Sequence, residues 1–265
     1  MVLAVNIGNS YTFFGLFGGD GVISVKFKIS SYIGKTSDEY FSLINTLLAE
    51  NKVEVSEING VIISSVVPQL TLTVSETLSR LTKVAPILVG PGVKTGFSIK
   101  IDNPSELGAD MVANAAAVIE GQRNRSVQPS ASVVIDMNTV TTVSAINKCG
   151  EYVGCAIIPG VQMSFDSMRL NTALLPNVML SSPRKAIGKN SQESVRAGVI
   201  YGTAFMLDGF VYKFAKEMKC SIEELDLTIT GEYADSVIEV CNSKFNYDKE
   251  LTLKGLYCIY RNNIK

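Results

Sequence analysis

The chain begins MVLAVNIGNSYTFFGLF (residues 1–17), in which an apolar run, a polar glycine-containing turn and a second apolar run follow one another. This pattern predicts a β-hairpin with strands at 2–5 and 12–16. It returns at residues 135–144, IDMNTVTTVS, again with Asp or Asn after an apolar strand and hydroxyls on the returning strand. Because the two copies begin the two halves of the chain, they predict two similar lobes.

The segment between the copies separates these lobes. Residues 121–131 (GQRNRSVQPSA) are polar and mixed, so we predict lobes at 1–121 and 131–265. Apolar β-branched runs alternate with helical patterns in the chain, which favours an α/β fold. We expect further strands at 22–29, 60–67, 86–89 and 227–230, a helix beginning at 37, and helices at 71–82, 106–120, 195–219 and 251–260.

The composition excludes several classes of function. Twenty-four basic and 25 acidic side chains nearly balance, which gives no electrostatic reason to expect nucleic acid or a membrane surface as partner. No apolar run reaches the ~18 residues of a membrane span, and no basic segment precedes an apolar one as in a signal peptide. The chain has no histidine, which excludes Ser-His-Asp and Cys-His nucleophiles and the usual zinc sites.

Other familiar sites are also missing from the sequence. It contains no GxxxxGK[ST], GxGxxG or GxSxG motif, which argues against Walker-type, Rossmann and serine hydrolase sites. Its five cysteines have no CxxC spacing. They favour reduced, mostly buried thiols in a cytoplasmic protein.

Three polar segments are candidate sites, each with a structural alternative. Gly8 lets the backbone of the first turn approach a phosphate, and Ser10 and Thr12 can donate hydrogen bonds, but the turn is also a plain tight hairpin. Asp110 can act as a general base, or it can simply complement a helix dipole. Ser191 is expected as a helix N-cap, which accounts for its segment without a ligand.

Nine segments together resemble the type III pantothenate kinase family, nearly end to end and in order. They are VNIGNSYTFFGLF (5–17), SSVVP (64–68), ELGADMVANAAAVI (106–119), IDMNTVTTVSAI (135–146), GCAIIPGVQMSFDSM (154–168), LNTALLPNV (170–178), IGKNSQESVRAG (187–198), TGEYA (230–234) and LTLKGL (251–256).

The resemblance implies a two-lobed actin-like kinase fold of the ribonuclease H-like (ASKHA) class, with a nucleotide cleft between the lobes. It implies transfer of the ATP γ-phosphate to pantothenate at the first step of coenzyme A synthesis. It also implies Mg²⁺, a monovalent cation (K⁺ or NH₄⁺), and a dimer whose substrate pocket includes a residue from the other subunit.

The resemblance also assigns site residues by position. The nucleotide positions are Asn6, Gly8, Asn9, Ser10 and Thr12 in the first phosphate loop, Thr139 in the second, and Gly231 beside the adenine. The pantothenate positions are Leu107, Gly108, Ala109 and Asp110, with Asp110 as general base, and Ser191 across the subunit interface. Asp136 falls at the monovalent cation position, and Asn6 falls at a weakened position for the divalent metal.

Several of these positions depart from the family pattern. Asn6 stands in place of an aspartate and Asn138 in place of the glycine of DxGT. Met111 replaces an arginine, Ile101 a tyrosine and Glu232 a glycine, and Ser191 replaces a threonine. The changes affect the metal, phosphate, substrate and adenine positions, whereas Asp110 and Asp136 are retained. The packing segments are unchanged, which indicates a maintained fold with a degenerate active site.

Three functions remain open from the sequence. The chain is an active pantothenate kinase with an altered site, or a subunit that pairs with a more complete paralogue, or a catalytically inactive regulatory or binding protein built on the kinase fold. We place the kinase first because Asp110 and Asp136 are retained, although a fold alone does not establish an activity.

Overall fold

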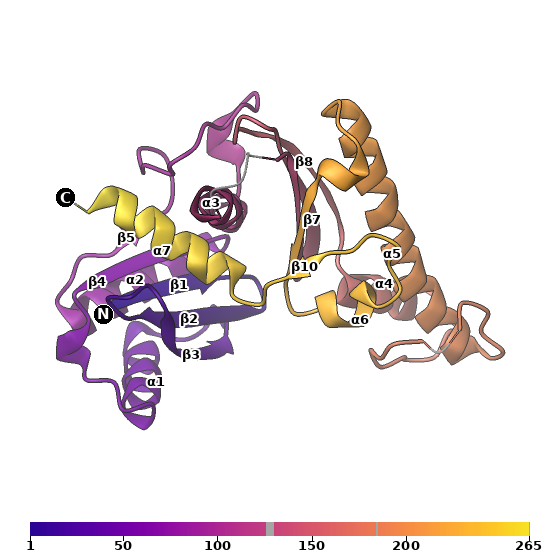
Figure 1. Ribbon diagram of the computed structural model, residues 1–265. Coiled ribbons are helices and arrows are strands. Elements are labelled where there is room, and N and C mark those ends of the chain that lie inside the picture. Colours follow the sequence, from indigo (N-terminus) through magenta and orange to yellow (C-terminus); the bar gives the residue numbers. More distant parts are fainter. Residues whose placement is uncertain (126–129, 184, 265) are drawn as a thin grey trace. The chain divides into compact units, whose positions relative to one another are not determined.

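A computed structural model of the chain describes residues 1–125, 130–183 and 185–264 (Figure 1). The chain divides into two compact units. The first contains Met1–Phe97, Asp102–Gly121 and the C-terminal segment from Glu250, and the second contains Ser98–Ile101 and Gln122–Lys249. The main segment of the second unit begins at Gln122.

The C-terminal helix α7 (Leu251–Asn263) belongs to the first unit, so the second unit is shorter than the predicted lobe at 131–265. Close packing explains the difference. The ring of Tyr257 stacks on Phe17 with 4.5 Å between centroids. Gly255 lies against the backbone of Ala113, where a β-carbon would collide with the carbonyl oxygen. These contacts are far apart in sequence and leave no local pattern.

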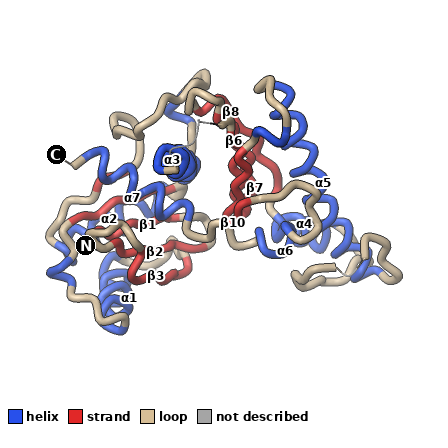
Figure 2. The backbone as a smooth tube through the Cα atoms, viewed as in Figure 1, coloured by secondary structure: helices blue, strands red, loops and turns tan. Residues whose placement is uncertain are grey.

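The first unit has a sheet of five strands in its described residues, in the order β3-β2-β1-β4-β5. Figure 2 shows strands in red, with β1, β2 and β3 of this sheet labelled. β1 pairs antiparallel with β2 and parallel with β4. The strands are β1 (Val2–Ile7), β2 (Tyr11–Phe17), β3 (Ile23–Ser30), β4 (Gly60–Ser65) and β5 (Ile87–Leu88), and the other helices are α1 (Ser37–Glu50), α2 (Pro68–Thr82) and α3 (Ala109–Asn124), which continues past Gly121.

The sheet of the second unit repeats this order as β8-β7-β6-β9-β10 in its described residues. β6 pairs antiparallel with β7 and parallel with β9, as β1 pairs with β2 and β4. The strands are β6 (Ser132–Met137), β7 (Val140–Ile146), β8 (Tyr152–Pro159), β9 (Asp226–Thr230) and β10 (Asn246–Tyr247), and the helices are α4 (Val161–Asn171), α5 (Ser191–Glu217) and α6 (Ala234–Ile238). The internal repeat and the α/β class predicted from the sequence are therefore confirmed.

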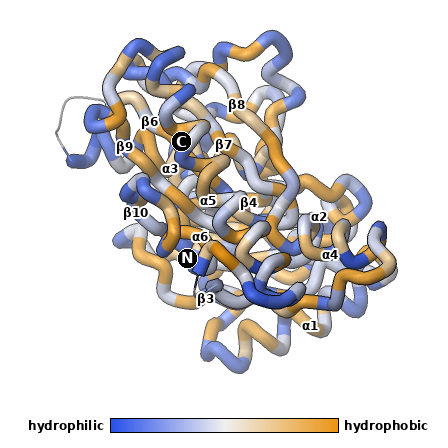
Figure 3. Tube along the Cα trace, turned by 90° about the vertical axis from the view of Figure 1, so that its right-hand side faces the viewer, coloured by the Kyte–Doolittle hydropathy of each residue, from blue (hydrophilic) through white to orange (hydrophobic). Residues whose placement is uncertain are grey.

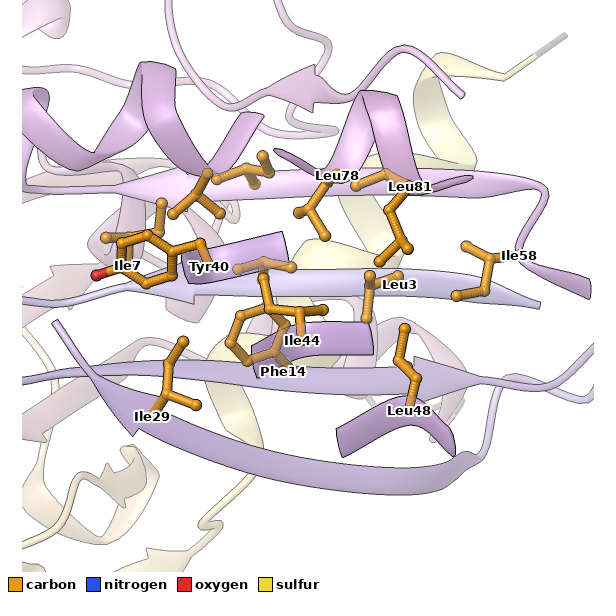
Figure 4. Packing of buried hydrophobic residues seen from close by; sticks show 14 of the residues in the cluster. Leu3, Ile7, Phe14, Ile29, Tyr40, Ile44, Leu48, Ile58, Leu78 and Leu81 are labelled. Carbon is orange, nitrogen blue, oxygen red and sulfur yellow. The ribbon is translucent and has the colours of Figure 1, made fainter. Parts of the chain in front are cut away.

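Each unit has its own hydrophobic core. In the first, Tyr40, Ile44 and Leu48 of α1 project onto the sheet, where they meet Leu3 and Phe14 (Figure 4). The capping box of Thr36 and Glu39 fixes the start of this helix. In the second, apolar residues of β6 and β7 pack with those of α5. Coloured by hydropathy in Figure 3, the chain is hydrophobic through most of β6 and hydrophilic at many outer turns.

The structure corrects several details of the sequence predictions. Strand β8 and helix α4 carried no clear sequence signal, and α3 begins at Ala109 because Pro104–Glu106 forms a separate 3₁₀ turn. All five cysteines are unpaired, but none is fully buried, and Cys149 and Cys155 are exposed. No helix in the described ranges is long and apolar enough to cross a membrane.

Candidate active site

The first turn follows β1, and its leading residue, Asn6, is held by the neighbouring strand. The Asn6 side chain is only 6% exposed, and its Oδ1 accepts a 2.7 Å hydrogen bond from the hydroxyl of Ser64 at the end of β4. The parallel pairing of β1 with β4 places these residues side by side. The turn therefore presents a neutral buried amide where the family pattern has a carboxylate.

The rest of this turn divides into buried and exposed groups. Thr12 is fully buried, and its hydroxyl shares a 2.9 Å hydrogen bond with the hydroxyl of Ser31. The N–H of Gly8 donates to the carbonyl of Tyr11 at 3.0 Å. Asn9 and Ser10 are exposed. Of the predicted phosphate residues, Asn9 and Ser10 are thus exposed, and the buried Thr12 hydroxyl is bonded to Ser31.

Asp110 lies in the first turn of α3, next to the predicted pantothenate residues 107–109. Its Oδ1 accepts a 2.8 Å hydrogen bond from the backbone N–H of Met111. Burial raises the pKa of this carboxyl above its ordinary value, and the backbone hydrogen bond only partly opposes that effect. No basic side chain in the described ranges pairs with it. The half-buried Asp110 therefore has the environment of a carboxylate with increased proton affinity.

The residues around Asp110 leave little free volume on one side. A β-carbon at Gly108 would lie 2.7 Å from Asp110 Oδ1, so only glycine fits there without displacing the carboxylate. Met111, which stands where the family has arginine, is buried at 6% exposure. The side chain at this position therefore packs in the interior and provides no bidentate contact for an anion.

The second turn follows β6 and contains a connected set of polar groups. Asp136 is 5% exposed, and its Oδ1 accepts a 2.6 Å hydrogen bond from the side-chain amide of Asn138. The carbonyl oxygen of the same Asn138 side chain accepts a 3.2 Å hydrogen bond from the backbone N–H of Glu232. The Asn138 side chain thus bridges the carboxylate and the loop after β9, instead of leaving the open backbone that a glycine would give.

Two glycines pack directly on the backbone of this turn. Gly231 has a φ of +103°, and a β-carbon there would lie 2.5 Å from backbone atoms of Met137. At Gly160 a β-carbon would lie 2.2 Å from the carbonyl oxygen of Thr139. The structure therefore brings Asp136, Thr139 and Gly231 together, which the sequence could suggest only through the family resemblance.

Ser191 lies elsewhere in the second unit, at the first residue of α5. The predicted N-cap assignment is wrong by one residue: Asn190 is the N-cap, and its side chain accepts a 2.9 Å hydrogen bond from the N–H of Glu193. Ser191 itself is exposed. Its hydroxyl is thus not required to cap the helix and is available to a ligand.

The positions implied for the divalent and the monovalent ion each offer few protein ligands. Mg²⁺ prefers oxygen ligands and usually one or two carboxylates, but Asn6 offers only an amide oxygen and no charge. No group of three or more His, Cys, Asp or Glu side chains in the described ranges could hold a metal. At Asp136, the carboxylate oxygen facing the turn already accepts the Asn138 amide. The described residues therefore offer Mg²⁺ no cluster of charged ligands, and at the monovalent cation position Asn138 occupies one oxygen of the Asp136 carboxylate.

Two residues of the site were not found by sequence reasoning. Ser64 and Ser31 hold Asn6 and Thr12 from positions 58 and 19 residues away. A serine following an apolar strand has many roles, so no local signal separates these two. The parallel pairing of β1 and β4, once predicted, would have pointed to Ser64.

Comparisons with known proteins agree with this architecture. The family model for type III pantothenate kinase matches residues 2–213. Proteins named type III pantothenate kinase from Anaeromyxobacter dehalogenans strain 2CP-C and Anaeromyxobacter sp. strain K are each 36% identical over 99% of this chain and 100% of their own length.

Solved structures with low sequence identity share the fold. A protein described as a Baf family transcriptional activator from Campylobacter jejuni has a TM-score of 0.59 and 18% identity, covering 98% of both chains. A protein described as a 2-dehydro-3-deoxygalactonokinase from Sinorhizobium meliloti has a TM-score of 0.55 and 10% identity, covering 99% of this chain and 97% of that one. An archaeal actin homologue has a TM-score of 0.50 and 16% identity, covering 98% and 99%. The fold is thus the actin-like fold with two units, and the chain belongs to the type III pantothenate kinase family.

Proposed function

We propose that this chain transfers the γ-phosphate of ATP to the 4′-hydroxyl of pantothenate, the first step of coenzyme A synthesis. The observation that carries the proposal is Asp110, a half-buried carboxylate with a raised pKa at the position where the family has its base. A base whose pKa moves toward neutral pH accepts a proton more readily in the transition state.

In the proposed reaction Asp110 acts on the acceptor hydroxyl. The hydroxyl oxygen forms a bond to the γ-phosphorus of ATP, the bond from that phosphorus to the bridging oxygen breaks, and ADP leaves. Asp110 takes the hydroxyl proton, as the catalytic aspartate does in other kinases. Residues 107–109 orient the pantothenate beside it, and Gly108 keeps the backbone close to the carboxylate.

The two turns contribute to nucleotide binding in this proposal. The exposed Asn9 and Ser10 contact the phosphates from the first turn, Thr139 contacts them from the second, and Gly231 borders the adenine. Thr12 positions the turn through Ser31. If Mg²⁺ were bound with ATP it would supply charge neutralisation of the phosphates, and Asn6 would offer it only a neutral amide oxygen. Because Asn6 adds no charge, we expect the chain to bind this complex more weakly than a protein with aspartate would.

A second function is favoured by the altered turns themselves. With Asn6 neutral and Asn138 filling the second turn, the chain can instead serve as a subunit that supports a more complete paralogue, or as a non-catalytic binding protein. These functions predict a folded chain that binds a partner or ligand but gives no product alone.

We also propose that the chain works as a dimer in the cytoplasm. Phe205, Met206 and Tyr212 are exposed on α5, and the nearby Gly198 and Gly202 leave open space beside the helix. Such an apolar helix face suits another subunit, either a second copy or a paralogue. Five unpaired cysteines favour a reducing compartment. Light scattering on the purified chain measures whether it pairs with itself.

The test is formation of phosphorylated pantothenate by the purified chain with ATP and Mg²⁺. The Asp110→Asn variant should lose roughly 10²–10⁴-fold in rate, the usual contribution of a general base. Glu106→Gln is the matched control, because Glu106 is an exposed carboxylate four residues earlier that accepts a hydrogen bond from Asn103. It should keep its rate. Equal product from wild type and Asp110→Asn would contradict the role of Asp110.

A further inference from the structure

The second turn holds a nearly buried carboxylate, and the structure places a side-chain amide donor against it. Asp136 is 5% exposed, and the Asn138 amide donates to its Oδ1 at 2.6 Å. We propose that the Asn138 carboxamide takes the place of a monovalent cation at Asp136, so that this chain neither binds nor needs K⁺ or NH₄⁺ there. The inference concerns how the turn is held together and does not require the chain to be an active kinase.

The hydrogen bonds fix which way the carboxamide points. Its nitrogen must face Asp136, because a carboxylate accepts and cannot donate, and its oxygen must face the backbone N–H of Glu232, which donates at 3.2 Å. Both ends would be mismatched in the flipped orientation. The donor end of the amide dipole therefore lies against Oδ1 of the carboxylate, where it occupies space that a cation bound to that oxygen would need.

The backbone on either side leaves the turn little room to open for an ion. Gly231 packs against the backbone of Met137 from the loop after β9, and Gly160 packs against Asn138 and Thr139 from the end of β8. The N–H of Tyr233 also donates to the carbonyl of Met137 at 3.1 Å. A cation that takes the place of the amide at this carboxylate oxygen would separate the Asn138 side chain from both Asp136 and the Glu232 N–H.

The replacement of glycine by Asn138 and the hydrogen bonds of the Asn138 side chain support the same proposal. With glycine at 138, as in the family pattern, neither the amide donor nor the amide acceptor exists. Asp136 then faces a gap of about one side chain, and an ion with oxygen ligands can fill that gap. With asparagine, a neutral group of the chain itself occupies that place and donates a hydrogen bond to Asp136. This hydrogen bond does not depend on which salt is present.

Thermal unfolding in matched salts tests this without ATP or pantothenate. We would measure wild type, Asn138→Gly and Asn147→Gly in KCl, NH₄Cl and NaCl at equal ionic strength. Asn147 is the matched control, because its carboxamide also bridges a carboxylate (Glu151) and backbone N–H groups in a turn of the same sheet.

We expect the Tm of wild type and Asn147→Gly to be the same in all three salts. Asn138→Gly should unfold at lower temperature in NaCl and regain about 5 °C in KCl or NH₄Cl when the ion is at ~100 times its Kd. A specific rise of the wild-type Tm with K⁺ or NH₄⁺ would overturn the proposal. So would an Asn138→Gly protein that folds but responds equally to all three salts.

A second readout covers the case in which Asn138→Gly does not fold. Asn138→Ala removes the same carboxamide without adding backbone freedom, and it should show the same recovery in KCl. In addition, crystals of wild type soaked in a thallium(I) salt, a stand-in for K⁺, should show no anomalous peak beside Asp136. A peak there would contradict the proposal directly. Because no nucleotide is present, neither result depends on whether the chain phosphorylates pantothenate.

Discussion

The two hairpin turns have the same strand arrangement, but the first has a neutral leading side chain and the second has a carboxylate. In the first, a neutral Asn6 accepts from Ser64 and no carboxylate is present between residues 6 and 12. In the second, the carboxylate of Asp136 remains, and Asn138 has been added beside it. The first turn therefore has no charged side chain, whereas the carboxylate of the second turn is hydrogen-bonded to Asn138. The same residue type, asparagine, therefore removes ligand chemistry in one turn and substitutes for a ligand in the other.

The turns also differ in how tightly the backbone is packed. A β-carbon at Gly8 in the first turn would lie 3.1 Å from the Tyr11 carbonyl oxygen, a contact that small shifts can relieve. A β-carbon at Gly231 beside the second turn would lie 2.5 Å from the Met137 backbone at a φ of +103°. The first turn therefore has slightly more room for an added methyl group than the backbone beside the second turn.

The largest expected effect is a pH dependence of the rate that is set by Asp110 and not by either turn. Burial raises its pKa, and the base must be deprotonated, so kcat/KM should fall about tenfold per pH unit once the pH is below that pKa. The folded chain binds this proton more tightly than the unfolded chain. The ionised Asp110 therefore lowers stability as pH rises from the ordinary value of 3.8 to the raised pKa, and below 3.8 this penalty is absent.

Rates measured across pH, together with Tm across the same range, check this. Variants of either turn should leave the acidic limb of the rate profile unchanged. An acidic limb that moves when Asn6 or Asn138 is replaced would mean that the turns, and not Asp110, set the profile.

The difference in packing predicts unequal effects of adding one methyl group. Gly231→Ala should lose about 3 kcal/mol of unfolding free energy, from a left-handed φ and from overpacking. Gly8→Ala should lose only about 1 kcal/mol, because its φ is ordinary and its nearest contact is longer. Urea unfolding of both variants measures the two losses, and equal losses would remove the contrast between the turns.

Restoring a carboxylate at position 6 of the first turn should lower the free energy of unfolding. Asn6→Asp keeps the acceptor for Ser64 but buries a charge, which should cost about 2 kcal/mol of stability at pH 7. The cost should disappear as pH falls below about 3.9, where the carboxyl is protonated in both states. The exposed Asn9→Asp change in the same turn serves as control and should alter Tm little. A cost that persists at low pH would indicate a packing defect instead.

The smallest effect compares two threonines at corresponding register positions. Thr12 pairs with Ile7 across the first hairpin and bonds to Ser31, whereas Thr141 pairs with Met137 across the second. The Thr141 hydroxyl is buried and has no hydrogen-bond partner in the described ranges. Thr12→Val should therefore lose about 1 kcal/mol, and Thr141→Val should be neutral or slightly stabilising. Thermal unfolding of the two variants decides the sign, and a loss at Thr141 would show that its hydroxyl has a partner after all.

Local sequence patterns sufficed for much of the fold. The two hairpins and the helix beginning at Ser37 follow from alternation, caps and polarity within short windows. The position of α7 did not follow, because contacts such as Tyr257 with Phe17 join the ends of the first unit. The short strand β10 and helix α6 were too short to carry a periodic signal.

The site was less predictable than the fold. Family position identified Asn6, Asp110 and Asp136, but not what they contact. The Asn138 bridge joins residues 94 positions apart, and the Asn6–Ser64 bond joins residues 58 apart. The Asn190 cap, one residue from the predicted Ser191, depends on backbone geometry that neighbouring polar residues could equally have adopted.

The most direct test of the account is γ-phosphate transfer by the isolated wild-type chain, beside Asn6→Asp and Asp110→Asn, over a range of Mg²⁺ concentrations. We predict phosphorylated pantothenate from wild type, and an increase of about tenfold in kcat/KM for ATP in Asn6→Asp, equivalent to ~1.4 kcal/mol of added transition-state stabilisation. Asp110→Asn should give only background. If neither wild type nor Asn6→Asp forms product above that background, the chain is not a kinase on its own, and the partner-subunit or binding function takes its place.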